Sequence, residues 1–264
     1  MNSELDSNGP PPLPVMRILQ EGIYLPAKHA ATLIRIVWPL VVLQVLNIVL
    51  TGWHEQQNPE DISGRWIAFS FFLGLVMFAA STLATVACHR VFILGDDSMK
   101  GQGPVWWSSR ETWFVVYSIT LALIIMMPLM VILPFVFSIS PEEYGIWILV
   151  GIAPVGFLMT LLAAYCVGRW SLILPATAVD DEDRQRFAWA WSISTGNGLR
   201  LMVIIGLLPL GVSLVYPFLP NLNSIVYSIL VEIAFLYFAA VQIAWLSLSY
   251  RELMQHQVVG TEDS

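Results

Sequence analysis

Six long apolar stretches confine this sequence to a membrane architecture. Ionisable residues separate the first five, and a predicted turn at 217–224, rich in proline and asparagine, separates the last two. A helix needs about 20 mostly apolar residues to cross a hydrocarbon layer of roughly 30 Å. The stretches predict transmembrane helices at about 33–53, 66–88, 113–138, 145–168, 201–219 and 224–248. Lipid offers the backbone no hydrogen-bond partners, so each span should be α-helical. We therefore predict an all-α fold, a polytopic membrane helix bundle of six transmembrane helices in three hairpins.

The composition excludes several other classes of protein. Of the 264 residues, 57% are hydrophobic and 12% charged, whereas soluble domains carry about 25% charged residues. The many aromatic residues argue against a disordered chain, and two cysteines, Cys88 and Cys166, are too few for a disulfide-stapled one. A net charge of −7 argues against a nucleic-acid partner, because binding phosphates requires a cationic face.

The lysines and arginines predict the orientation of the chain in the membrane. Eleven of the twelve fall on one side of the predicted spans, and Arg65 falls on the other. Because cytoplasmic loops are enriched in these residues, we expect both termini in the cytoplasm. The chain then divides into a cytoplasmic N-terminal tail (1–27), a six-span domain (28–251) and a cytoplasmic C-terminal tail (252–264).

Shorter segments on the same side predict interfacial helices. Val15, Ile18, Leu19, Gly22 and Ile23 form an apolar stripe at helical spacing before Pro26. A second amphipathic helix is expected from Arg184 to Thr195, after the acidic run 180–183 and before Gly196. The apolar segment 170–179 is too short to span the bilayer and is expected at the interface.

Arginines bracket each predicted hairpin, at positions 35 and 90, 110 and 169, and 200 and 251. Either the chain contains three copies of one helical hairpin, or each helix end independently favours arginine for headgroup phosphates and the helix dipole. The closing arginines, Arg90, Arg169 and Arg251, are candidate contacts for lipid headgroups or a protein partner.

Glu232 is the most informative single residue, because a carboxylate inside a membrane span is costly and belongs against protein or water. Gln44 and Asn47, three positions apart on the first span, are candidate partners for it. This set is either a polar transport site or a group of interhelical hydrogen bonds.

Catalytic chemistry finds no support in the sequence. The chain has no nucleophile elbow, His-Glu-x-x-His motif, phosphate-binding loop or dinucleotide fingerprint. The run Asp180 to Asp183 could hold a divalent cation, but its spacing favours helix capping. We expect no enzyme activity, no cofactor and no metal site.

Three segments resemble a known family. These are Cys88-His89-Arg90 with the following Val91 to Gly95, the segment Arg169 to Ala176, and the segment Ala190 to Arg200. They look like a pattern in uncharacterised six-helix bacterial inner-membrane proteins, similar to the membrane domain of some glycerophosphodiester phosphodiesterases. The likeness covers about residues 28–253. It implies a bacterial plasma membrane and a non-catalytic domain, since the phosphodiesterase barrel is absent.

These observations lead to two expected functions. The first is a non-enzymatic membrane protein that organises or accompanies lipids or other membrane proteins. The alternative is a small-solute or ion transporter that uses Glu232 in a cavity between proline-bent helices. The expected partners are the phospholipid bilayer and other membrane proteins or a second copy of this chain.

Overall fold

A computed structural model describes residues 12–57, 64–100, 107–138, 151, 153–215 and 225–262, and this part of the chain contains helices and turns but no strand. Five helical segments are long and apolar enough to cross a membrane, and a sharply bent pair of helices brings the total to six. The protein is therefore an all-α, multi-pass membrane bundle, as the sequence predicts. The predicted turn at 217–224 and most of the segment 139–152 lie outside the described residues.

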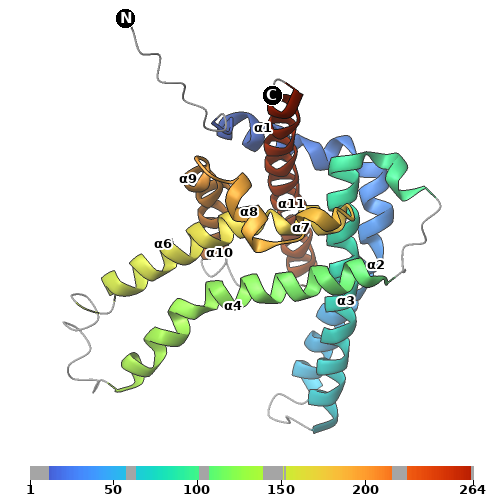
Figure 1. The fold of residues 1–264 in the computed structure, drawn as a ribbon. Coiled ribbons are helices and arrows are strands. Elements are labelled where there is room, and N and C mark those ends of the chain that lie inside the picture. The colour runs from blue at the N-terminus through green and yellow to red at the C-terminus, as the bar shows by residue number, and fades with distance from the viewer. Residues whose placement is uncertain are drawn as a thin grey trace, which may run out of the picture.

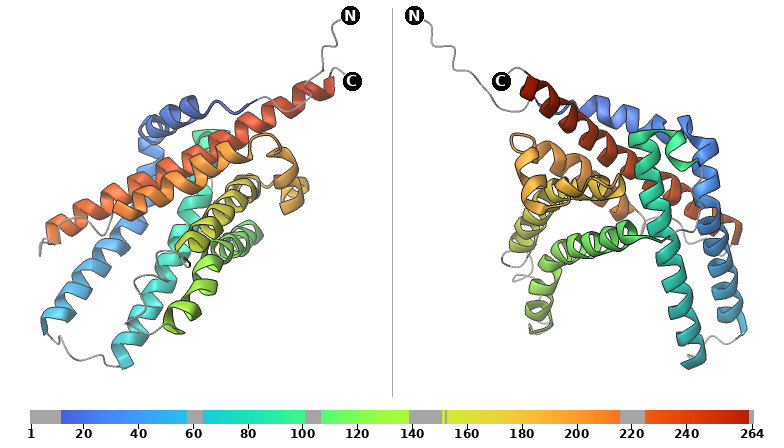
Figure 2. Two further views of the ribbon diagram at one scale, coloured as in Figure 1. Left: turned by 90° about the vertical axis from the view of Figure 1, so that its left-hand side faces the viewer. Right: turned by 45° about the vertical axis from the view of Figure 1, so that its right-hand side comes forward.

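The main helices pack as three hairpins (Figures 1 and 2). In the first, α2 (Ala30–Gln57) lies beside α3 (Gly64–Leu94). In the second, α4 (Ser109–Ser138) lies beside α6 (Ala153–Trp170), and α4 bends in the half that contains Pro128 and Pro134. Proline removes a backbone donor and crowds the preceding turn, which explains the bend. In the third, the π-helix η4 (Met202–Leu207), which leads into α10 (Leu208–Val215), packs against α11 (Ile225–Glu262).

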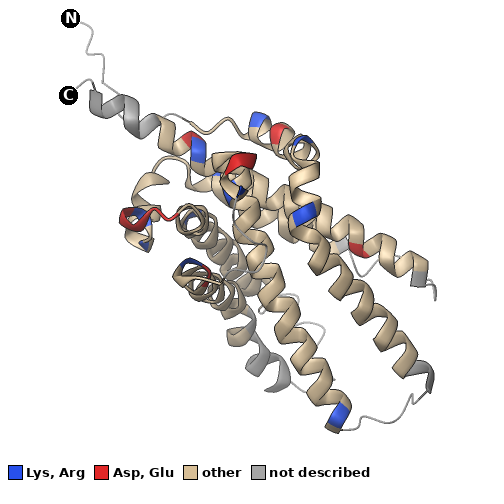
Figure 3. Ribbon diagram, turned by 90° about the vertical axis from the view of Figure 1, so that its right-hand side faces the viewer, with Lys and Arg blue, Asp and Glu red and all other residues tan. Residues whose placement is uncertain are grey.

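Charged residues gather at one end of the bundle, which we call the charged end (Figure 3). The described chain also begins and ends there. The short elements α1 (Val15–Lys28), η1 (Asp96–Met99), α7 (Ile173–Ala178), η3 (Glu182–Arg184) and α8 (Phe187–Ile193) lie at this end. The one-sided pattern of lysine and arginine in the sequence thus corresponds to one end of the fold.

The N-terminal amphipathic helix is present and longer than its apolar stripe predicts. Helix α1 passes through Pro26 and continues to Lys28, with Ile18, Gly22 and Pro26 buried. It packs along α11, where the indole Nε1 of Trp245 donates to the carbonyl of Leu19 over 3.1 Å.

The segment 170–179, predicted at the interface, lies at the charged end and is packed inside the protein. Most of its central helix, α7, is buried, with Ile173, Ala176, Thr177 and Ala178 showing no exposed surface and Leu174 partly exposed. Helix α7 packs against α3, α4 and α11, so it forms part of the core of the charged end. A ten-residue apolar segment carries no periodicity that separates a buried helix from an interfacial one.

The second amphipathic helix is shorter than predicted. Residues 182–184 form a single 3-10 turn, and α8 begins only at Phe187. Helix α8 ends at Ile193, before the predicted stop at Gly196, which takes a positive φ of 79° three residues farther on. Helix α8 and the following segment, α9 (Gly198–Leu201), η4 (Met202–Leu207, a π-helix) and α10, form the pair bent by 109°.

Candidate functional site

A cavity of about 1040 Å³ lies between α2, α3, η1 and the start of α4. Sites for small organic ligands are commonly about 300–1,000 Å³, so this space is large for a small molecule. One part of its lining is apolar and includes Ile36, Leu43, Val76 and Ala80. The other part is charged and lies at the charged end. The cavity therefore has the polarity of an amphiphile.

The face of α3 that lines the cavity explains the space. It carries Val76, Ala79, Ala80, Leu83, Ala84 and Ala87 at helical spacing. Alanine side chains occupy little of the space between two helices, so this face leaves room beside α2. Arg90 follows on the same face, one turn beyond Ala87.

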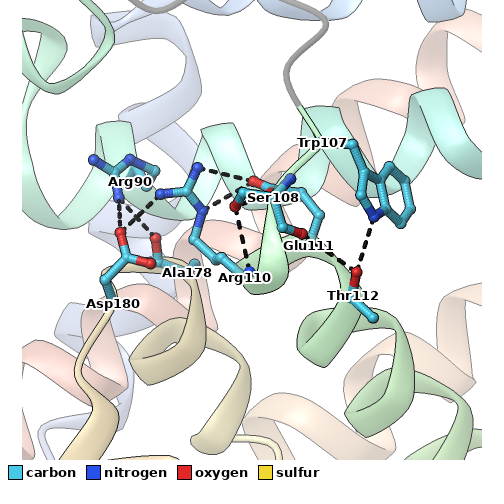
Figure 4. A network of polar contacts seen from close by, with 8 residues as sticks. All are labelled: Arg90, Trp107, Ser108, Arg110, Glu111, Thr112, Ala178 and Asp180. Atoms are coloured by element: carbon cyan, nitrogen blue, oxygen red, sulfur yellow. Dashed lines mark hydrogen bonds and ion pairs between the residues drawn. The ribbon is translucent and has the colours of Figure 1, made fainter.

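The charged part of the lining contains Arg35, Arg90, Lys100 and Arg110 together with Asp96 and Glu111. Arg90 and Arg110 come from α3 and α4, and both contact Asp180 in the segment between α7 and α8 (Figure 4). One carboxylate oxygen, Oδ2, accepts from Nη1 of Arg90 over 3.1 Å and from Nη1 of Arg110 over 2.8 Å. Three segments far apart in the sequence are thus joined by one carboxylate.

The start of α4 explains how Arg110 is held. Ser108 and Glu111 form a capping box, in which the Glu111 carboxylate accepts from the Ser108 backbone N–H over 2.8 Å and from the Ser108 hydroxyl. Glu111 is 2% exposed and also accepts from Nε and Nη2 of Arg110. This carboxylate neutralises the Arg110 guanidinium on one edge and leaves Nη1 for Asp180.

The acidic run 180–183 connects helices rather than simply capping one. Asp180 has a φ of 61°, a left-handed conformation that aspartate tolerates better than most residues. Asp181 pairs with Arg184 over 2.6 Å and lies 3.4 Å from the hydroxyl of Tyr250. No three His, Cys, Asp or Glu side chains are grouped as a metal site in the described part of the chain. The spacing of acids alone could not reveal the contact with Tyr250, which lies 69 positions away in sequence.

Asp96 marks the edge of the cavity toward α1. Its carboxylate lies 3.0 Å from Nδ1 of His29. Hydrogen bonds from Thr32 and His29 hold the pKa of Asp96 below its ordinary value. This carboxylate thus stays ionised and fixes η1 to the start of α2.

Of the three arginines predicted as headgroup contacts, Arg169 is buried and bonds to other residues of the protein. It is 6% exposed, and its guanidinium lies 3.6 Å from the centre of the Trp191 ring. Its donors bond to Ser194 over 2.7 Å, to Tyr165 over 3.1 Å, to Thr195 over 3.4 Å and to the carbonyl of Trp191. Arg169 therefore organises α6 and α8 and does not present its charge at a surface.

Arg251 differs from Arg90 and Arg169 in its contacts. It is half-buried on α11 and makes no hydrogen bond or ion pair within the described ranges. The three predicted arginines therefore do not form one equivalent surface.

Two of the three residues predicted to form an intramembrane polar set, Gln44 and Glu232, are in contact. Nε2 of Gln44 on α2 donates to Oε1 of Glu232 on α11 over 2.7 Å. Asn47 lies about one turn farther along α2, and no hydrogen bond links its side chain to Glu232 within the described structure. The cavity lining does not include Glu232.

Comparisons with protein-family models, with curated proteins and with solved structures find no match to this chain.

Proposed function

We propose that this chain is a non-enzymatic membrane protein that binds membrane lipids in the cavity between α2, α3 and α4, and thereby organises lipids or accompanies other membrane proteins. The observation that carries the proposal is the polarity of the cavity, with an alanine-rich wall along α3 and arginines at the charged end. Phospholipids have the matching distribution of apolar and charged groups.

The dimensions of the cavity support this ligand class. From Val76 to Arg90, α3 rises about 20 Å at about 1.5 Å per residue. One leaflet contributes about half of the roughly 30 Å hydrocarbon thickness. An acyl chain can therefore lie along this wall with its headgroup at the arginines.

We further propose a bacterial inner membrane as its location, with both termini in the cytoplasm. The resemblance to six-helix bacterial inner-membrane proteins and the one-sided distribution of lysine and arginine support this orientation.

Filling the cavity tests the proposed function. We expect Ala80→Phe to reduce severalfold the lipid that co-purifies with the protein and that native mass spectrometry detects, because the new ring occupies the chain site. Gly74→Phe is the matched control on the same helix, since a side chain built at Gly74 meets no atom within 4 Å. Equal lipid retention by both variants and the wild type would contradict lipid binding in this cavity.

A further inference from the structure

The guanidinium group of Arg90 has one part in use and one edge free. Its Nη1 donates to the carbonyl of Ala178 and to Asp180, each over 3.1 Å. Its Nε is buried and has no hydrogen-bond partner among the described residues, and Nη2 makes no hydrogen bond to them either. A buried donor left unpaired destabilises the folded protein. Such an exception requires an explanation, and a bound acceptor supplies one.

The free edge has the geometry of an oxyanion receptor. The N–H groups of Nε and Nη2 point in parallel and can donate to two oxygens of one carboxylate or phosphate. Arg110 uses this same edge for Glu111, with both nitrogens 2.9 Å from the single oxygen Oε1. The protein thus already binds a carboxylate oxygen with this edge of an arginine one helix away from Arg90.

The Arg90 side chain is also held in place. Its contacts to Ala178 and Asp180 join α3 to the segment after α7, and the side chain is 12% exposed (Figure 4). A guanidinium fixed on one side loses less conformational entropy when its other edge binds a ligand.

The surroundings select a phosphate on a lipid over a carboxylate from the protein. Arg90 lies at the charged end of the alanine-rich wall, so a headgroup bound there places its acyl chain beside Ala80 and Leu83. Arg35 lines the same cavity from α2, is exposed, and makes no ion pair within the described structure. It adds a second positive charge for a phosphate.

We propose that the Nε–Nη2 edge of Arg90 binds the phosphate group of a membrane phospholipid whose acyl chain lies in the cavity. This inference rests on the proposed lipid-binding function and assigns the headgroup chemistry and the residue that recognises it.

A charge-conserving substitution tests the assignment. Arg90→Lys keeps the positive charge and removes the parallel pair of donors, and Arg186→Lys is the control on an exposed arginine outside the cavity lining. The probes are phosphatidic acid and diacylglycerol with identical chains, titrated into purified protein and measured by native mass spectrometry. We expect Arg90→Lys to weaken phosphatidic acid binding about tenfold and to leave diacylglycerol binding unchanged. Equal binding of the two lipids by the wild type, or equal behaviour of the two variants, would overturn the assignment.

Two further measurements use the wild-type protein. Photoactivatable phosphatidic acid should label α2 and α3 near Ala80, and labelling confined to other helices would contradict the site. Soluble glycerol phosphate, added at the same concentration as phosphatidic acid, should not displace the bound phosphatidic acid. Complete displacement would assign the site to a free phosphate ester in place of a lipid.

The two proposals can fail separately. If Ala80→Phe removes bound lipid while Arg90→Lys matches the control, lipid binding stands and the role of Arg90 is wrong. If Ala80→Phe has no effect on either probe, the cavity is not the lipid site and the proposed function fails.

Discussion

At the scale of single residues, the arginines of the charged end differ in how much of their hydrogen-bonding capacity the protein uses. Arg169 bonds to hydroxyl and carbonyl groups and stacks on Trp191, and no carboxylate of the described residues contacts it. Arg110 uses both edges on Glu111 and Asp180. Arg90 has one edge without a partner among those residues. The residue type is the same, so the packing around each side chain determines whether it has a structural role or remains available to a ligand.

Replacement of Arg169 tests its structural role. Arg169→Lys keeps the charge but cannot reproduce the fork of donors or the stacking on Trp191, which lies 3.6 Å from the guanidinium. We expect the variant to lose about 2–4 kcal/mol of stability, because buried acceptors in α8 lose their donors. Thermal unfolding in detergent measures the change, with Arg251→Lys as control. An unchanged melting temperature would place Arg169 outside the stabilising network.

Two measurements on the Gln44–Glu232 pair distinguish a structural role of the Glu232 carboxylate from a role in transport. A double-mutant cycle with Gln44→Leu and Glu232→Leu should give a coupling energy of about 0.5–2 kcal/mol, as expected for an interhelical hydrogen bond at 2.7 Å. Proteoliposomes with a pH-sensitive dye provide the second measurement. Proton flux that disappears in Glu232→Gln would favour the transporter.

At the scale of helices, a glycine allows two backbones to come into contact in the charged end. A Cβ atom at Gly168 on α6 would lie 2.9 Å from the backbone nitrogen of Met202 and 3.0 Å from the carbonyl of Leu201. Small residues let membrane helices come into backbone contact, and here they bring α6 against the π-helix η4. Pro209 follows this π-helix by two residues, and its missing N–H and bulky ring disturb the preceding helical hydrogen bonds.

Gly168→Ala should therefore separate α6 from η4. Both clashing partners are backbone atoms, so the helices must move, and we expect a loss of about 1–3 kcal/mol. Gly211→Ala is the matched control, since its added Cβ meets nothing within 4 Å. Thermal unfolding should show a lower melting temperature for the first variant alone, and equal values would contradict this packing.

Prediction from the sequence works at this scale because the bilayer imposes a minimum length on each apolar helix. The spans near Arg65, Arg90 and Arg169 follow directly from the spacing of charges. The partners of those charges do not follow. Asp180 meets Arg90 across 90 positions of sequence, and only the packing of α7 inside the bundle brings them together. The pairing of Gln44 with Glu232 was open to prediction because each is an isolated polar residue in an apolar span.

At the scale of the whole molecule, charge and chain ends share one end of the bundle (Figure 3). This arrangement gives a test of the proposed orientation. In a background with Cys88 and Cys166 replaced by Ala, a membrane-impermeant maleimide applied to intact cells should label Ser63→Cys and not Thr261→Cys. The reason is the positive-inside rule, which retains the arginine-rich side in the cytoplasm. Labelling of Thr261→Cys alone would invert the orientation.

The length of α11 has a mechanical consequence. Its 38 residues extend about 57 Å at about 1.5 Å per residue, nearly twice the roughly 30 Å of hydrocarbon. One continuous rod thus runs from the membrane interior to the surface on which α1 rests, with Trp245 bonded to Leu19 at the junction. Bilayers of different thickness change the tilt of long helices. We therefore expect a change in the tilt of α11 to move α1 as well, because α1 packs along α11, so that the position of α1 would depend on the thickness of the surrounding membrane.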